Sequence, residues 1–147
     1  MANVAKWNAP AAVATVLSTD LNSLGNSSLS TPTESGATYD NSANLDLYAN
    51  FELALASLNP TGSPYCALHF LPTFDGTNYA DAAASLTSHV LCSFPLTTGS
   101  AAKRVTVKNV LLPALKGKFA LENGSGVSLA ASGNTVKIIV ADVNLNG

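Results

Sequence analysis

The chain has 147 residues, 47% of them hydrophobic, which is enough for one domain with a hydrophobic core. Only 11% of the residues are charged, against roughly 25% in ordinary soluble domains, and the net charge of −2 excludes nucleic-acid binding driven by bulk positive charge. The polar residues are mostly Asn, Ser and Thr, which predicts a surface that neighbouring molecules cover; the alternative is a monomer with Ser- and Thr-coated sheets.

The N-terminal part, residues 1–43, is expected to be an extended arm outside the folded domain. Residues 18–42 are rich in Ser, Thr, Asn and Gly, a composition that does not form a core of its own. Residues 11–24 have weak helical spacing, but their β-branched residues fit a strand equally well. We predict that the arm contacts a neighbouring subunit or another protein through five apolar anchors: Trp7, Val13, Leu17, Leu21 and Leu24.

The same N-terminal stretch shows no secretory signal, because polar residues interrupt its apolar content. No run of 18 apolar residues occurs in the chain. We therefore expect a protein that is made in a cytoplasm and has no membrane span.

From residue 44 onward, apolar and polar residues alternate as they do in strands with one buried face. Further strands are predicted at residues 65–71, 86–96, 104–112, 118–122 and 135–143, separated by turns rich in Gly, Pro and Asn. The longest alternation places these side chains inward: Leu45, Leu47, Ala49, Phe51, Leu53 and Leu55.

Two of the shorter segments also predict which side chains face the core. In residues 104–112, the inward side chains are Val105, Val107 and Leu111. Arg104, Thr106 and Lys108 face outward in the same segment. In residues 86–96, the inward side chains are Leu86, Val90, Cys92, Phe94 and Leu96.

Six strands without a convincing helix predict an all-β fold. Residues 44–147 would form an antiparallel β-sandwich, jelly-roll-like in its connections, with the extended N-terminal arm attached.

Five of the seven basic residues lie between residues 103 and 118. The simplest interpretation is a solvated face of two strands. The more specific hypothesis is a contact with an acidic protein partner, for which Lys103, Arg104 and Lys108 are the candidates.

The segment LPTFDGTNYADAAAS, residues 71–85, is the one stretch that could hold a metal or catalytic loop. Calcium loops need acidic oxygens at alternate positions, but Asp75 and Asp81 are six residues apart. Asp75 followed by Gly76 is instead a strong turn signal. We predict a structural turn that Tyr79 holds against the sandwich.

Catalytic groups are few. His69 and His89 both fall in strand-like segments, and no Gly-x-Ser-x-Gly elbow is present. Cys66 and Cys92 lie in apolar runs without zinc-site spacing, which predicts two reduced, inward-facing thiols. The sequence therefore predicts no catalytic residue, no metal and no cofactor.

Three phrases in this order and spacing are familiar: NSANLDLYANFELALASL, ALHFLPTFDGTNYADA and AASGNTVKIIVADVN. Together they resemble small virion structural proteins of tailed bacteriophages, in particular head decoration or cement proteins. The resemblance covers residues 7–143, and DLYANFEL and LPTFDGTNYAD are its most distinctive parts.

The resemblance implies a non-enzymatic β-sandwich, often a homotrimer, on the outer surface of an icosahedral head. Its partners would be the major capsid protein and other copies of itself, with no direct contact to nucleic acid or membrane. A tail, collar or fibre subunit is the structural alternative. A carbohydrate-binding module displayed on the virion is another, and it would use exposed aromatic residues such as Trp7, Tyr48 or Tyr79.

Overall fold

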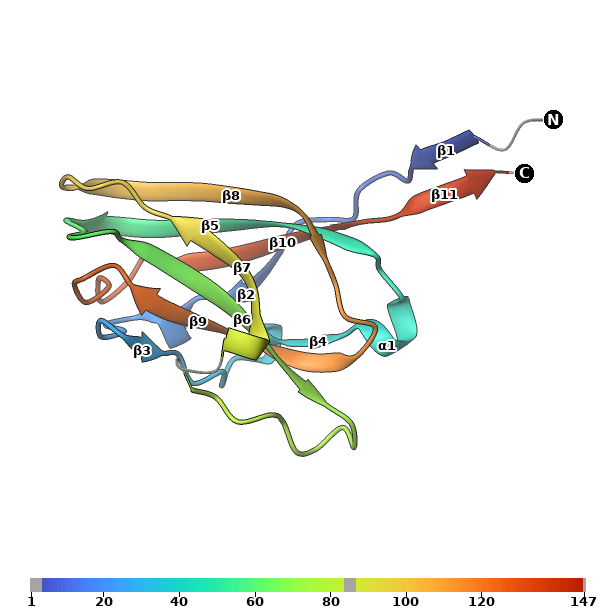
Figure 1. The fold of residues 1–147 in the computed structure, drawn as a ribbon, viewed down its shortest axis with the longest axis horizontal. Coiled ribbons are helices and arrows are strands. Elements are labelled where there is room, and N and C mark those ends of the chain that lie inside the picture. The colour runs from blue at the N-terminus through green and yellow to red at the C-terminus, as the bar shows by residue number, and fades with distance from the viewer. Residues whose placement is uncertain (1–3, 84–86, 147) are drawn as a thin grey trace.

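The computed structural model describes residues 4–83 and 87–146, and Figure 1 shows two layers of strands packed against each other. One sheet has the strand order β2-β10-β5-β8, and the other has the order β3-β9-β6-β7, with β4 also pairing with β9. The strands are β1 (Val4–Trp7), β2 (Ala14–Leu17), β3 (Ser28–Leu29), β4 (Thr38–Asp40), β5 (Tyr48–Leu58), β6 (Tyr65–Thr73), β7 (Val90–Pro95), β8 (Ala101–Leu111), β9 (Lys116–Gly124), β10 (Thr135–Ala141) and β11 (Val143–Asn146).

All of these pairings are antiparallel. The predicted antiparallel β-sandwich is therefore confirmed, whereas the jelly-roll connectivity stays a prediction. The helical elements are short: η1 (Thr19–Leu21), η2 (Ser35–Ala37), α1 (Asn41–Asn44) and η3 (Thr87–His89). In the part of the chain that the structure describes, no helix is long and apolar enough to cross a membrane.

Strand β5 lies in the middle of the four-stranded sheet and alternates as predicted. Ala49, Phe51 and Leu53 are fully buried, while the residues between them are half-buried on the outer side. The prediction is wrong for Leu45 and Leu47, which are 64% and 44% exposed. They precede the strand, because Leu45 caps α1 in a left-handed conformation (φ 55°) and the chain becomes extended only afterwards.

Strand β8 departs from simple alternation at a bulge. Val107 pairs with Phe51, but the next inward pair joins Val110 to Ala49, so β8 has one more residue than β5 across this interval. Asn109, in the bulge, has a left-handed backbone (φ 54°). Val110 is consequently buried and Leu111 is 61% exposed, which corrects the predicted inward orientation of Leu111.

Strand β7 is shorter than the predicted segment of residues 86–96. Phe94 and Leu96 are buried as predicted, but Val90 is 38% exposed. The pairing with β6 shifts by one residue between Cys92 and Val90, which turns Val90 to the outer side. Leu86 lies outside the described residues.

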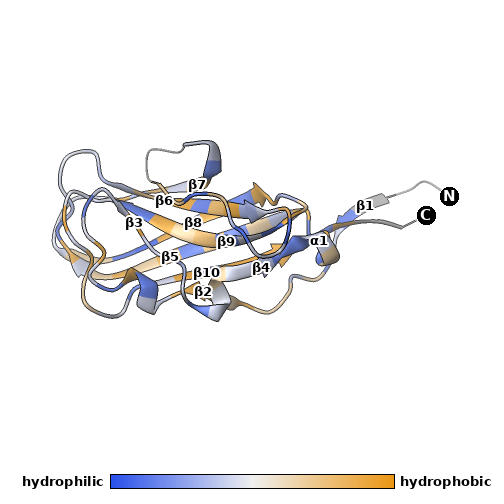
Figure 2. Ribbon diagram, turned by 90° about the horizontal axis from the view of Figure 1, so that it is seen from below, coloured by the Kyte–Doolittle hydropathy of each residue, from blue (hydrophilic) through white to orange (hydrophobic). Residues whose placement is uncertain are grey.

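The core is aromatic at its centre. Phe119 on β9 is fully buried, and its ring centroid lies 5.5 Å from that of Phe51 and 5.4 Å from that of Phe70. The ring of Tyr39 on β4 packs on Phe119 at 5.8 Å, so rings from both sheets meet here. Figure 2 shows the hydrophobic segments of the ribbon concentrated in the strands of the two layers.

The predicted N-terminal arm is wrong for residues 14–43, which belong to the sandwich. Strand β2 pairs with β10, and β3 and β4 pair with β9. Leu17 and Leu21 have no exposed surface. The polar residues are used internally: the Glu34 carboxylate accepts hydrogen bonds from the backbone of Ser18 and Asp20, at 2.7 and 2.8 Å. The predicted boundary at residue 43 therefore does not separate an arm from a folded domain.

What does project from the sandwich is a ribbon made from both ends of the chain. Strands β1 and β11 pair only with each other and extend away from the two layers (Figure 1). The predicted last strand, residues 135–143, is thus divided at Asp142 between β10 and β11.

The two cysteines are free thiols on the inner side of β6 and β7, as predicted. Cys66 is fully buried and pairs with Phe94, and Cys92 is half-buried and pairs with Leu68. Burial raises the pKa of both thiols to about 12, so they are un-ionised at neutral pH.

Candidate binding surface

Four of the eight predicted contact residues are not available to a partner. Leu17 and Leu21 are in the core, and Leu24 is half-buried against it. Lys103 is 8% exposed, and its ammonium group donates a hydrogen bond of 2.8 Å to the carbonyl oxygen of Gly99. Lys103 therefore holds the β7–β8 turn and does not contribute to a basic surface.

The other four predicted contact residues share one side of the molecule, the outer face of the four-stranded sheet. Val13 immediately precedes β2 and is 59% exposed, and Trp7 at the end of β1 is 55% exposed. Arg104 and Lys108 are exposed on β8. These residues share a face without being neighbours, because β2 and β8 are the two edges of the sheet and Trp7 is on the adjoining ribbon.

An exposed apolar patch lies where the β1–β11 ribbon joins this sheet. The rings of Trp7 and Tyr48 meet edge to face, with centroids 5.7 Å apart. Tyr48 pairs with the exposed Leu111 across β5 and β8, and Trp7 pairs with Val143 across the ribbon. We call Trp7, Tyr48, Leu111 and Val143 the ribbon-base patch. Leu111 belongs to the ribbon-base patch only because of the bulge in β8, and no sequence pattern predicts that bulge.

A groove of about 310 Å³ adjoins the ribbon-base patch. Beside Trp7, its walls contain the side chains of three asparagines and one lysine. The lining residues are Trp7, Asn8, Pro10, Asn50, Lys108, Asn109 and Ala141.

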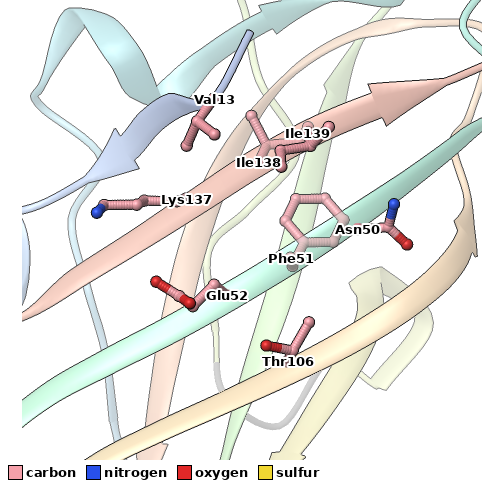
Figure 3. Close-up of a pocket in the computed structure, with 8 residues that line it drawn as sticks. All are labelled: Val13, Asn50, Phe51, Glu52, Thr106, Lys137, Ile138 and Ile139. Carbon is pink, nitrogen blue, oxygen red and sulfur yellow. The ribbon is translucent and has the colours of Figure 1, made fainter. Parts of the chain in front are cut away.

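Further along the same face lies a second depression, of about 240 Å³ (Figure 3). Val13, Ile139 and Thr106 provide its apolar surface, and Asn50, Glu52 and Lys137 its polar groups. Its floor is the part of the sheet that carries Phe51 and Ile138, whose side chains are 0% and 4% exposed. We call this depression the central hollow.

The net charge of this face has the opposite sign to the net charge of the rest of the molecule. Arg104, Lys108 and Lys137 alternate outward on β8 and β10, and Glu52 is the single carboxylate among them, 3.5 Å from Arg104. Three positive charges and one negative give this face +2. Because the whole chain carries −2, the remaining residues carry −4.

The loop after β6 is a structural turn, as predicted. The Asp75 carboxylate accepts hydrogen bonds from the backbone amides of Asn78 (2.7 Å) and Thr77 (2.8 Å), and Gly76 takes a left-handed conformation (φ 77°). The Lys118 ammonium lies 4.6 Å from the centre of the Tyr79 ring, which ties the loop to β9. Among the described residues, no group of three His, Cys, Asp or Glu side chains could hold a metal ion.

Asp75 should make the loop sensitive to acid. The backbone amides of Asn78 and Thr77 hold the pKa of its carboxyl well below its usual range. A depressed pKa stabilises the fold above the unfolded-state value of about 4, and this contribution is lost as the pH falls below it. We expect the melting temperature of wild type to fall more between pH 5 and pH 2 than that of Asp75→Asn. Equal slopes would contradict this role.

A polar cluster on β6 and β9, buried at His69 and Glu122 and exposed at Tyr65, was not expected from the sequence. The Tyr65 hydroxyl donates to Glu122 at 2.8 Å, and Nε2 of His69 lies 3.1 Å from the other oxygen of that carboxylate. His69 has no exposed surface, and neither the groove nor the central hollow is lined by this cluster. The cluster therefore joins two neighbouring strands. Glu122 lies beside these residues because of the register between β6 and β9, and the sequence alone does not reveal that register.

Comparisons with known proteins add no assignment to this surface. No protein-family model matches the chain, and no curated protein is significantly similar to it.

Proposed function

We propose that this protein is a bacteriophage virion structural protein, a decoration or cement protein on the outside of the head. Its partners would be the major capsid protein and other copies of itself, and its action would be mechanical and not catalytic. The observation that supports this most is the ribbon-base patch, because large apolar side chains stand exposed where the projecting β1–β11 ribbon joins the four-stranded sheet.

The energetics favour a partner at this patch. A two-stranded ribbon is at best marginally stable in water, and β1 and β11 have only four residues each. Packing the ribbon against another protein would stabilise it. It would also bury side chains such as Trp7 and Leu111, at roughly 1.5–3 kcal/mol for each large apolar group. A protein bound across two capsid subunits in this way opposes their separation.

Two properties of the whole chain also support this function. The low charge suits a component that is packed among neighbours. The resemblance of three sequence phrases to virion structural proteins indicates the same class.

The test is to rebind the purified protein to particles from which it has been stripped. Wild type should restore the heat resistance of the heads. A Trp7→Ser, Leu111→Asp double variant should not, because it removes the apolar anchors at exposed positions. Val90→Thr, which changes an exposed apolar residue on the other sheet, is the matched control and should behave as wild type.

Two outcomes would count against cementing. One is full heat resistance of the stripped heads, and the other is localisation of the protein on the tail or collar by electron microscopy. The latter result would establish the alternative of a tail or fibre subunit.

A carbohydrate-binding module is the second candidate, and one observation favours it. The Trp7–Tyr48 pair stands beside the groove that Asn8, Asn50 and Asn109 line, an arrangement of an aromatic surface next to amide groups that could bond sugar hydroxyls. Binding of wild type to a glycan array, lost in Trp7→Ala, would support this function.

A further inference from the structure

Phe74 is the most exposed large hydrophobic residue in the described part of the chain, at 91%. It lies in the loop after β6, next to Asp75, whose carboxylate is bonded to two backbone amides of the same loop. A second support is the hydrogen bond of 3.0 Å that the Gly76 amide donates to the Thr73 hydroxyl. The loop thus presents an aromatic ring on a backbone that is already ordered, as anchors in protein interfaces are.

The central hollow matches this ring in size and character. Its volume is about 240 Å³, and a cavity of about 150 Å³ is enough to accept benzene. Val13 and Ile139 offer apolar surface at its sides, and Thr106 adds a methyl group. A phenyl ring in the hollow would therefore exchange water contacts for aliphatic ones on more than one side.

The two features do not meet within one chain. The loop leaves the five-stranded sheet at the end of β6, whereas the hollow is on the outer face of the four-stranded sheet. The exposure of Phe74 confirms that it occupies no hollow of its own molecule. We propose that Phe74 of one copy inserts into the central hollow of a second copy of this chain.

Charge complementarity selects a second copy as the occupant. Asp75 directly follows Phe74 and Asp81 follows later in the same loop. Among the described residues, the Lys118 ammonium over Tyr79 is the one positive charge tied to this loop, so the loop region has a net charge of −1. The face around the hollow carries the outward side chains of Arg104, Lys108 and Lys137 with the single carboxylate of Glu52, a net charge of +2. An acidic loop docking on this basic face would be attracted to it, and the attraction would weaken with added salt.

The symmetry of the assembly follows from this contact. Phe74, which we call the knob, and the central hollow are different surfaces, so the contact between two copies is heterologous. Repeated contacts of this kind either close into a ring or continue as a filament. A closed ring of three would be the homotrimer expected of a decoration protein. This inference deepens the proposed function by naming how the copies join, but it concerns the protein alone and does not depend on which particle, if any, it binds.

The experiment uses two single variants that each disable one side of the contact. Phe74→Ala removes the knob and keeps the hollow, whereas Thr106→Trp fills the hollow from an exposed position and keeps the knob. Sedimentation velocity of each variant alone should show monomers, with a dissociation constant for self-association raised at least about tenfold. An equimolar mixture should form dimers and no larger species, because only one productive contact remains.

Val90→Thr is the control for altering an exposed side chain elsewhere and should assemble as wild type. Unchanged melting temperatures of the variants at low protein concentration would establish that they are folded. The proposal is overturned if wild type is monomeric at all concentrations, if Phe74→Ala assembles as wild type, or if the mixture of folded variants stays monomeric. Heat protection of heads by a monomeric wild type would separate failure of this contact from failure of the proposed function.

A charge exchange tests separately whether the loop and the face around the hollow attract each other electrostatically. Asp81→Lys and Lys137→Glu should each weaken self-association in 50 mM salt, because each places like charges opposite one another. Mixing or combining the two changes should recover part of the affinity. Equal affinity of all these variants would show that the loop docks on a different face.

Discussion

Deleting residues 1–43 is expected to leave a chain that does not fold. The deletion removes β2 from one sheet and β3 and β4 from the other. It also removes Leu17 and Leu21 from the core and Tyr39 from the aromatic cluster around Phe119. Far-ultraviolet circular dichroism and a thermal scan should show no cooperative transition at any temperature, in contrast to the full chain.

The same point is testable with single substitutions that leave the chain intact. Leu21→Ala should lower the free energy of unfolding by about 2–5 kcal/mol, because a fully buried leucine leaves a cavity. Val13→Ala, at a position that is 59% exposed, is the matched control and should change it by less than about 0.5 kcal/mol. A truncated chain that unfolds cooperatively, together with a small effect of Leu21→Ala, would restore the hypothesis of a separate arm.

Replacing Phe119 with alanine should have the largest effect of any single change, about 3–5 kcal/mol of unfolding free energy. Its ring has no exposed surface and contacts the rings of Tyr39, Phe51 and Phe70, which come from β4, β5 and β6. The loss includes the transfer of the ring to water, the cavity that remains and the edge-to-face contact with Phe51. Urea denaturation followed by circular dichroism would measure it.

Phe74→Ala is the matched control for this experiment, since it makes the same chemical change at a ring that is 91% exposed. At protein concentrations low enough to keep the chain monomeric, its stability should differ from wild type by less than about 0.5 kcal/mol. Comparable losses in the two variants would mean that the aromatic cluster is not the centre of the core.

The strands with strict alternation could be predicted because their burial depends on a local property. Side chains of successive strand residues point to opposite sides, so Phe51 and Leu53 had to share a face whatever paired with them. The turn at Asp75 and Gly76 was equally predictable, because its hydrogen bonds stay within four residues.

The prediction of an N-terminal arm was wrong because the burial of this segment depends on residues far away in the sequence. Its composition is polar, but Glu34 and Asp20 bond backbone groups some fifteen positions away, so polarity here marks internal bonding and not exposure. The anchors Leu17 and Leu21 fill a core that the later strands build, and the sequence alone does not show how much room those strands leave.

The all-β class, the burial of the central strands and the turn after β6 could therefore be predicted before folding was considered, because each follows from neighbours along the chain. The candidate binding surface, in contrast, could be identified only in the folded molecule. It depends on strand order, on the bulge at Asn109 that turns Leu111 outward, and on the pairing that brings Trp7 beside Tyr48. These are contacts between residues far apart in sequence, whose register is set by the packing of the whole core.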